Sequence, residues 1–369
     1  MALAVLFALY WPCRTCNGCG LPTWPTAAAP GHASTRGRPL HNRRTPGVGT
    51  TDRSHPGDVL IPESQLILRS AALTTGATDD ELARLRRRGA LQSLQRGAYV
   101  PINVLAALDH CARHRLEIQA TMSGLRRAAV VSHTSAAVLH GIPLWGMSLG
   151  PVHVTRSPPA STDYSSRLRV HVAQLGDREV CELDGVSVTT VPRTLLDLSR
   201  TTTFESGVVA TDFALHQRLT SSSELAALAA AAIRGIPGSL EASRVVGFAD
   251  CRSESVGESR SRVAIARLGL APPTLQLGIT TAGGSRIVKC DFGWREDRVV
   301  GEFDGKVKYG RLLRPGQSPG DVVFAEKLRE DAIRDEGWEV VRWVWADLAT
   351  PHVIAQRFNR AADRADRRH

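Results

Sequence analysis

Residues 258–345 switch between helical and strand periodicity in a fixed order, and this order limits the fold more than any other feature of the sequence. An amphipathic helix pattern comes first, three segments with the period-two alternation of strands follow, and a second helix and a fourth strand complete the series. The segments are 258–270, 274–279, 285–294, 297–305, 324–337 and 338–345. Helix, three-stranded meander, helix and strand predict a mixed α/β core of about a hundred residues.

Acidic residues gather in the second and third of these strands. A short hairpin connection at WREDRV places Asp291 directly opposite Glu302, with their Cβ atoms about 4.5–5.5 Å apart. Facing carboxylates destabilise a sheet, and a divalent cation offsets that cost. Asp304 and Lys306 share the face of Glu302 because alternate strand residues point the same way. The sequence therefore predicts Mg²⁺, with Mn²⁺ as the alternative, bound by Asp291, Glu302 and Asp304.

These residue types suit phosphodiester hydrolysis. The cation neutralises the attacked phosphate and lowers the pKa of a bound water, while Lys306 orients that water or stabilises the charge of the transition state. Glu258, on the preceding helix, is expected to support the site as an outer ligand. The alternative is that Glu302 and Asp304 lie on an exposed edge strand that ends in a turn. On that interpretation the acidic pattern has no catalytic meaning.

Lysine is confined to the same region. The chain has 46 lysine and arginine residues, and its lysines are Lys289, Lys306, Lys308 and Lys327. Because lysine is a compact charge with a tunable pKa and arginine is a rigid fork that stays protonated, a site that needs lysine resists replacement by arginine. The clustering favours the catalytic interpretation of residues 289–327.

A helix-turn-helix pattern opens the ordered part of the chain. A helix ending at Gly76 is followed by a second helix with a capping box at Thr78 and Glu81, and residues 90–101 alternate as a small β wing. Residues 57–103 therefore predict a winged helix-turn-helix. Its expected phosphate contacts are Arg84, Arg86, Arg87, Arg88 and Arg96. The alternative is a solvated, arginine-rich helix face.

Residues 104–247 mix strand and helix patterns and predict an α+β middle domain. Three of its histidines, His133, His140 and His171, are not spaced as ligands on one face. We interpret them as structural. A connector near 247–257 separates this domain from the C-terminal one.

The chain ends carry much of the formal net charge of +10. Residues 1–56 predict a disordered or mis-annotated extension, and residues 351–369 predict a basic tail. Cys13, Cys16 and Cys19 have C-x2-C-x2-C spacing without a diagnostic fourth ligand. The remaining cysteines do not form a disulfide framework, so a reducing cytoplasm is expected, and no segment predicts a membrane anchor.

ESRSRVAIARLGL, CDFGW, VVGEFDGKVKYG and EKLREDAIRDEGWEVVRWVW together resemble the domain of unknown function 559, which is similar to the very-short-patch-repair branch of the PD-(D/E)XK nucleases. The resemblance covers residues 255–350 and implies a restriction-endonuclease-like fold, with its first acidic residue at Asp291 and its second at Glu302, Asp304 or both. Asp304 stands where the family motif has lysine. The resemblance leaves the lysine role to Lys306 or to Lys327.

ELARLRRRGALQSLQRGAYVP, SHTSAAVLHGIPLWG and VTTVPRTLLDLSR resemble the antitoxins of abortive-infection type IV toxin–antitoxin systems. This resemblance implies an N-terminal DNA-binding winged helix and a toxin protein as a partner. The sequence thus predicts a multi-domain α/β protein with one of two functions. The first is a metal-dependent DNA endonuclease, and the second is a non-catalytic DNA-binding regulator or antitoxin with a degenerate nuclease fold.

Overall fold

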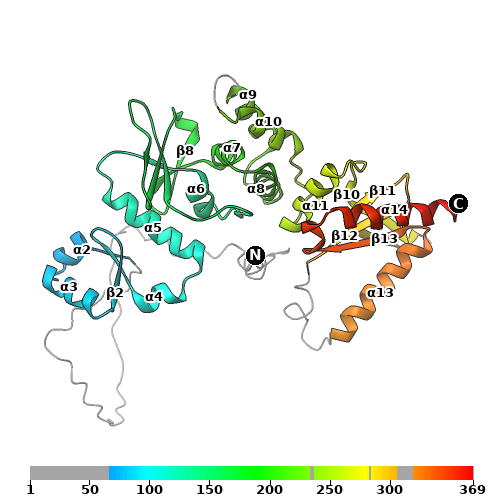
Figure 1. Cartoon of the computed structure of the whole chain (residues 1–369), viewed down its shortest axis with the longest axis horizontal. Coiled ribbons are helices and arrows are strands. Elements are labelled where there is room, and N and C mark those ends of the chain that lie inside the picture. The colour runs from blue at the N-terminus through cyan, green and yellow to red at the C-terminus, as the bar shows by residue number, and fades with distance from the viewer. Residues whose placement is uncertain (1–65, 233–236, 282–283, 306–318, 369) are drawn as a thin grey trace, which may run out of the picture. The chain divides into compact units, whose positions relative to one another are not determined.

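The computed structural model describes residues 66–232, 237–281, 284–305 and 319–368 (Figure 1). Every described element belongs to residues 64–369. The extension expected at residues 1–56, with its three closely spaced cysteines, lies outside the described residues. The described residues form helices and three β-sheets, of which two contain both parallel and antiparallel pairs, and this confirms a mixed α/β protein.

A three-stranded sheet and three short helices come first. They are β1 (Ile67–Leu68), α2 (Arg69–Thr74), α3 (Asp79–Arg87), β2 (Leu91–Gln95), β3 (Ala98–Pro101) and α4 (Ile102–Ala107). β3 lies between β1 and β2 and is antiparallel to both. The predicted capping box starts α3: the backbone N–H of Glu81 donates to the Thr78 hydroxyl, and the Thr78 N–H donates to the Glu81 carboxylate.

A six-stranded mixed sheet follows, in the order β6-β7-β5-β4-β9-β8. Its strands are β4 (Val130–Val131), β5 (Val152–Arg156), β6 (Asp163–Tyr164), β7 (Leu168–Val172), β8 (Val180–Leu183) and β9 (Val186–Thr189). The accompanying helices are α5 (His110–Gly124), α6 (His133–Leu139), the 3-10 helix η1 (Asp177–Glu179), α7 (Val191–Thr201), α8 (Phe204–His216), α9 (Ser222–Ala232) and α10 (Ser239–Phe248). α5 and α6 pack on this sheet through Ile118, Ala136 and Leu139.

The C-terminal elements follow the order that the sequence predicts. They are α11 (Val256–Arg267), β10 (Thr274–Thr281), β11 (Arg286–Trp294), β12 (Val299–Asp304), α13 (Pro319–Asp335), β13 (Glu339–Val344), η3 (Asp347–Ala349) and α14 (His352–Asp366). The sheet order is β10-β11-β12-β13. β10, β11 and β12 form an antiparallel meander, and β13 joins β12 in parallel after the crossover through α13.

Helices cover both faces of this C-terminal sheet. Neighbouring residues of β13 point to opposite faces, so Val340 and Val341 mark the two sides. Val341 packs in a core with Ile265 of α11 and Phe358 of α14. Val340 packs in a second core, to which α13 contributes Ile333. α11 and α14 therefore lie on one face, and α13 lies on the other.

The segment expected to be a basic tail is the helix α14. Ile354, Phe358, Ala361 and Ala365 are buried, and the first three belong to the core of the α11 face. This spacing of four, three and four residues places them on one side of the helix. Residues 351–368 are therefore not a tail. Arg357 contacts Asp347, and Arg364 and Arg368 pair with Glu339 of β13, so these arginines help to attach the helix to the sheet.

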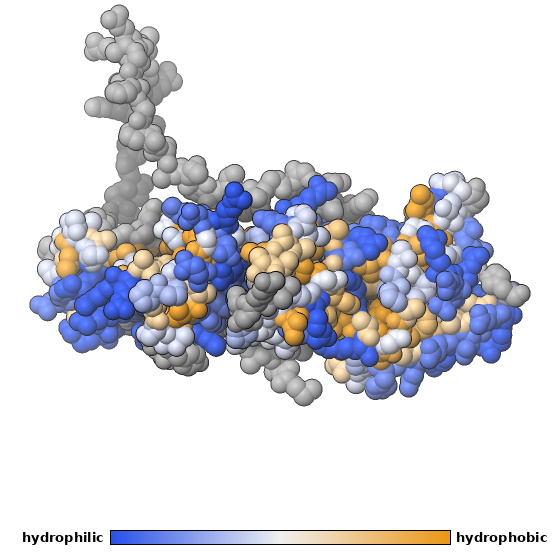
Figure 2. All heavy atoms as spheres, turned by 90° about the horizontal axis from the view of Figure 1, so that it is seen from above, coloured by the Kyte–Doolittle hydropathy of each residue, from blue (hydrophilic) through white to orange (hydrophobic). Residues whose placement is uncertain are grey.

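The face seen in Figure 2 mixes hydrophilic residues with smaller hydrophobic patches. Most of the large exposed apolar side chains are isolated from one another. Phe324 and Leu328 are the exception, because they lie one turn apart on α13. Among the described residues, no helix has the length and apolarity that a membrane crossing requires.

Candidate functional sites

The β11–β12 hairpin has the register expected from the sequence. A turn at residues 295–298 joins the strands, and Phe292 pairs with Gly301 as Trp294 pairs with Val299. The ladder between the two strands ends at Phe292 and Gly301, so Asp291 and Glu302 do not pair as the sequence predicted. The Asp291 carboxylate instead accepts a hydrogen bond from the backbone N–H of Phe303 at 2.9 Å. The hairpin thus fixes Asp291 in place through the backbone of the neighbouring strand.

Glu302 is buried and paired with arginine. Its Oε1 lies 2.6 Å from Nη1 of Arg329 on α13, and its Oε2 lies 3.2 Å from Nη2 of Arg342 on β13. Glu302 is two residues from Val300, which packs in the core of the α13 face, so both side chains lie on that face. Two guanidinium groups therefore neutralise the carboxylate that we expected to bind a cation.

Glu258 lies near Asp291 instead. It sits in the first turn of α11, which approaches β12 closely because Gly257 has no Cβ: one placed there would lie 2.0 Å from the Phe303 ring. The Glu258 carboxylate accepts hydrogen bonds from the Ser255 hydroxyl, the Glu254 N–H and the Gln276 amide. Burial and the neighbouring charge of Asp291 raise the pKa of Glu258 to about 7. The like-charge pair thus involves Glu258 rather than Glu302.

The predicted acidic ligands do not gather into one group. Among the described residues, a single set of three or more histidine, cysteine or acidic side chains brings its ligand atoms within 4.8 Å, and it contains none of the carboxylates discussed above. Asp304 is half-buried at the end of β12, where it pairs with Val344 of β13. Lys306 lies outside the described residues, and Lys327 is exposed on α13.

An exposed basic face follows α3. Arg84, Arg86, Arg87 and Arg88 are exposed at the end of this helix, and Arg96 is exposed at the turn between β2 and β3. The described contacts of this group are weak: Arg84 lies 3.9 Å from Glu81, and Arg86 lies over the Tyr99 ring at 5.7 Å. Most of this positive charge therefore remains available at the surface.

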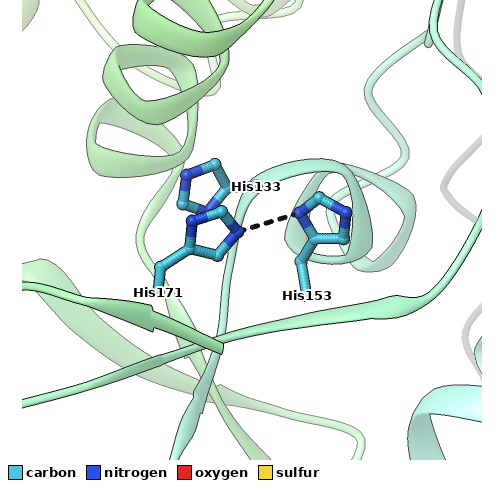
Figure 3. Close-up of side chains that lie close together, drawn as sticks. All are labelled: His133, His153 and His171. Atoms are coloured by element: carbon cyan, nitrogen blue, oxygen red, sulfur yellow. Dashed lines mark hydrogen bonds between the residues drawn. The ribbon is translucent and has the colours of Figure 1, made fainter. Parts of the chain in front are cut away.

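Three histidines converge in the middle of the chain (Figure 3). His133 begins α6, His153 lies in β5 and His171 lies in β7, and their ligand atoms lie within 4.8 Å of one another. His153 is not among the histidines singled out from the sequence. The signal was present, because two predicted strands carry a histidine each, and β5 and β7 are neighbours with Thr155 opposite His171. His140, by contrast, bonds through Nε2 to the carbonyl of Thr189 at 2.7 Å.

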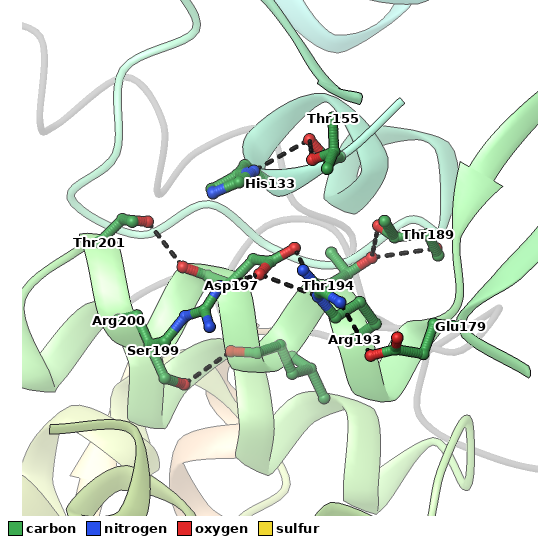
Figure 4. Close-up of polar contacts among 12 residues, drawn as sticks. His133, Thr155, Glu179, Thr189, Arg193, Thr194, Asp197, Ser199, Arg200 and Thr201 are labelled. Carbon is green, nitrogen blue, oxygen red and sulfur yellow. Dashed lines mark hydrogen bonds and ion pairs between the residues drawn. The ribbon is translucent and has the colours of Figure 1, made fainter. Parts of the chain in front are cut away.

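A buried ion-pair network lies beside these histidines (Figure 4). Arg193 of α7 donates to Asp197 at 3.1 Å and to Glu179 at 2.8 Å, and Arg200 pairs with the same Asp197. Asp197 is fully buried, and burial raises its pKa although both arginines oppose that change. The network balances two arginines with two carboxylates next to His133.

Comparisons with known proteins place the chain near proteins without a described function. No protein-family model matches it. The uncharacterized protein MT2308 of Mycobacterium tuberculosis (strain CDC 1551 / Oshkosh) is 31% identical over 133 residues, which are 36% of this chain and 46% of the relative. The uncharacterized protein Rv2248 of Mycobacterium tuberculosis (strain ATCC 25618 / H37Rv) matches with the same values. The match thus spans about half the length of these relatives.

Among solved structures, the RV2827C protein from Mycobacterium tuberculosis is 17% identical with a TM-score of 0.36. The match covers 50% of this chain and 72% of that one. At this TM-score the likeness supports no conclusion about fold or function.

Proposed function

We propose that this chain is a DNA-binding regulator that contacts duplex DNA through residues 67–101. The supporting observation is the order β1-α2-α3-β2-β3 with β3 between β1 and β2, an arrangement that matches a winged helix. In this kind of unit the second helix enters the major groove and the hairpin contacts the backbone. α3 and the β2–β3 turn carry the exposed arginines at these two places.

The arginines of α3 are placed to contact phosphates. Arg84, Arg87 and Arg88 have i, i+3 and i+4 spacing, which groups them on one side of the helix. Phosphate contacts supply most of the affinity for DNA and do not depend on its sequence. The arginines at the end of α3 are thus expected to hold the DNA backbone.

A binding measurement tests this proposal. We expect the double substitution Arg87→Gln and Arg88→Gln to weaken binding to a labelled duplex by roughly tenfold or more at low salt, by fluorescence anisotropy. The matched control is Arg126→Gln with Arg127→Gln, which removes two exposed arginines between α5 and β4. Equal losses in the two variants would contradict a role for α3.

The C-terminal domain supports a regulator more than a nuclease. Its order α11-β10-β11-β12-α13-β13 agrees with a restriction-endonuclease-like core. However, a cation at Glu302 would have to displace Arg329 and Arg342. We therefore propose that this fold serves as a scaffold that does not cut DNA.

Metal-dependent hydrolysis is the second candidate function, because Glu258 and Asp291 form a like-charge pair in the same core. A Mg²⁺ or Mn²⁺ ion between them would offset their repulsion. Incubation of plasmid, mismatched and single-stranded DNA with either cation separates the two functions. A scaffold leaves all three substrates intact. Cutting that is lost in both Glu258→Gln and Asp291→Asn would establish the nuclease instead.

A further inference from the structure

The three histidines on β5, β7 and α6 have the spacing of metal ligands. Nε2 of His171 lies 3.1 Å from Nδ1 of His153, which is also a hydrogen-bond distance, and one ligand atom from each of the three residues lies within 4.8 Å of the other two. Two imidazole nitrogens bound to one tetrahedral Zn²⁺ lie about 3.3 Å apart, since each Zn–N bond is about 2.0–2.1 Å. The nitrogen pair therefore already has the separation that a shared ion requires.

His133 is oriented by hydroxyl groups. Its Nδ1 bonds to the Ser132 hydroxyl at 2.9 Å, and that oxygen also accepts a hydrogen bond from the Thr155 hydroxyl at 2.8 Å. Nε2 is consequently the ligand atom on the far side of the ring. Histidine ligands are commonly oriented in this way, through a hydrogen bond at the other ring nitrogen. His133 also has φ = +52°, a left-handed conformation that a non-glycine residue adopts at a cost.

A network of buried ion pairs lies next to His133 (Figure 4). In it, Arg193 and Arg200 pair with Asp197 and Glu179, so these four residues together carry no net charge.

We propose that His133, His153 and His171 bind one Zn²⁺ ion per chain, with the fourth position taken by water or by a substrate group. Three imidazoles suit Zn²⁺ and related borderline metals, whereas Mg²⁺ prefers oxygen ligands. His133 is 5% exposed and the other two are half-buried, so the site is shielded on one side and open on the other. This is the pattern of a metal site that keeps one position for exchange.

Metal binding to the full chain, first stripped of metal, tests the proposal. We expect calorimetric titration with Zn²⁺ to give a site of one ion per chain that is lost in His153→Ala and in His171→Ala. His133→Gly serves as the variant least prone to misfold, because glycine suits φ = +52°. It should keep the circular dichroism of the wild type while losing the ion. Retention of the ion in all three variants would overturn the proposal.

Two controls distinguish this site from others in the chain. His140→Ala and the triple variant Cys13→Ser, Cys16→Ser, Cys19→Ser should both keep the ion. Substitution with Co²⁺ should give the visible absorption of a tetrahedral site without thiolate charge-transfer bands. Loss of the ion in the cysteine variant, or the appearance of those bands, would assign the metal to the cysteines and reject the histidine site.

Discussion

Glu302 shows how a single carboxylate can be held by arginine in a sheet. It is 8% exposed and contacts two guanidinium groups, which Glu326 and Glu330 also contact from α13. Glu302 is the most buried of the three carboxylates that contact these arginines, so its removal takes away their most desolvated acceptor. The side chain therefore has a structural role that does not require a metal.

Substitution Glu302→Gln should lower the free energy of unfolding by about 1–3 kcal/mol, because Arg329 and Arg342 lose a buried charged acceptor. Urea unfolding followed by circular dichroism measures the change. The control is Glu326→Gln, whose side chain is 37% exposed. It should cost less than about 1 kcal/mol. Equal costs would show that burial of Glu302 does not matter.

His140 offers a test of pH dependence outside the three-histidine group. Burial lowers its pKa, although its hydrogen bond to the Thr189 carbonyl opposes this change. Below about pH 6.5 the unfolded chain therefore binds a proton at this residue that the folded chain resists. Its contribution to stability is present above that pH and decreases as the pH falls.

In His140→Gln the amide can keep a hydrogen bond to Thr189 but does not titrate. As the pH drops below about 6.5, the stability of the wild type relative to this variant should fall by up to about 1.4 kcal/mol per pH unit. Denaturant unfolding of both proteins at several pH values gives the difference. A constant difference would mean that the pKa of His140 is not lowered.

Local sequence patterns were sufficient to predict the order of helices and strands in the C-terminal domain and the pairing of β11 with β12. The hairpin length and the alternation of hydrophobic residues specify that register, and both are readable from residues 285–305. The sequence did not predict which residues contact the carboxylates of Glu302 and Asp291. These contacts depend on how α11 and α13 pack, and Arg329 and Glu258 lie far from the hairpin in sequence.

The helix α14 was missed although its pattern is present. Its arginines led to the prediction of a basic tail. However, Ile354, Phe358 and Ala361 follow the i, i+4, i+7 spacing of a buried helix face. The histidine group was missed for a different reason. Its members come from three elements, and only the parallel pairing of β5 with β7 brings His153 beside His171.

Phe358→Ala tests whether α14 is part of the core. Phe358 is 8% exposed and meets Trp294 edge to face with ring centres 4.8 Å apart. Its truncation should cost about 3–5 kcal/mol, measured by denaturant unfolding. Phe324→Ala on α13 is the matched control, since that ring is 63% exposed and should cost no more than about 0.5 kcal/mol. Similar small costs in both would place α14 outside the core.

The effect of the net charge of +10 on the binding of a polyanion depends on where the charges lie. Several arginines form ion pairs within the fold. Arg262 pairs with Asp212 and Arg260 pairs with Glu205, and both pairs join α11 to α8. The arginines at the end of α3 are exposed and only weakly paired. Association with a polyanion is therefore expected at α3 rather than over the whole surface.

The salt dependence of DNA binding tests this account most directly. The slope of log K against log salt concentration is negative, and its magnitude decreases by about 0.9 for each phosphate contact that is lost. Replacement of Arg87 and Arg88 by glutamine should therefore make the slope shallower by roughly 2, while replacement of Arg126 and Arg127 should leave it unchanged. An unchanged slope in the α3 variant would contradict DNA binding through α3.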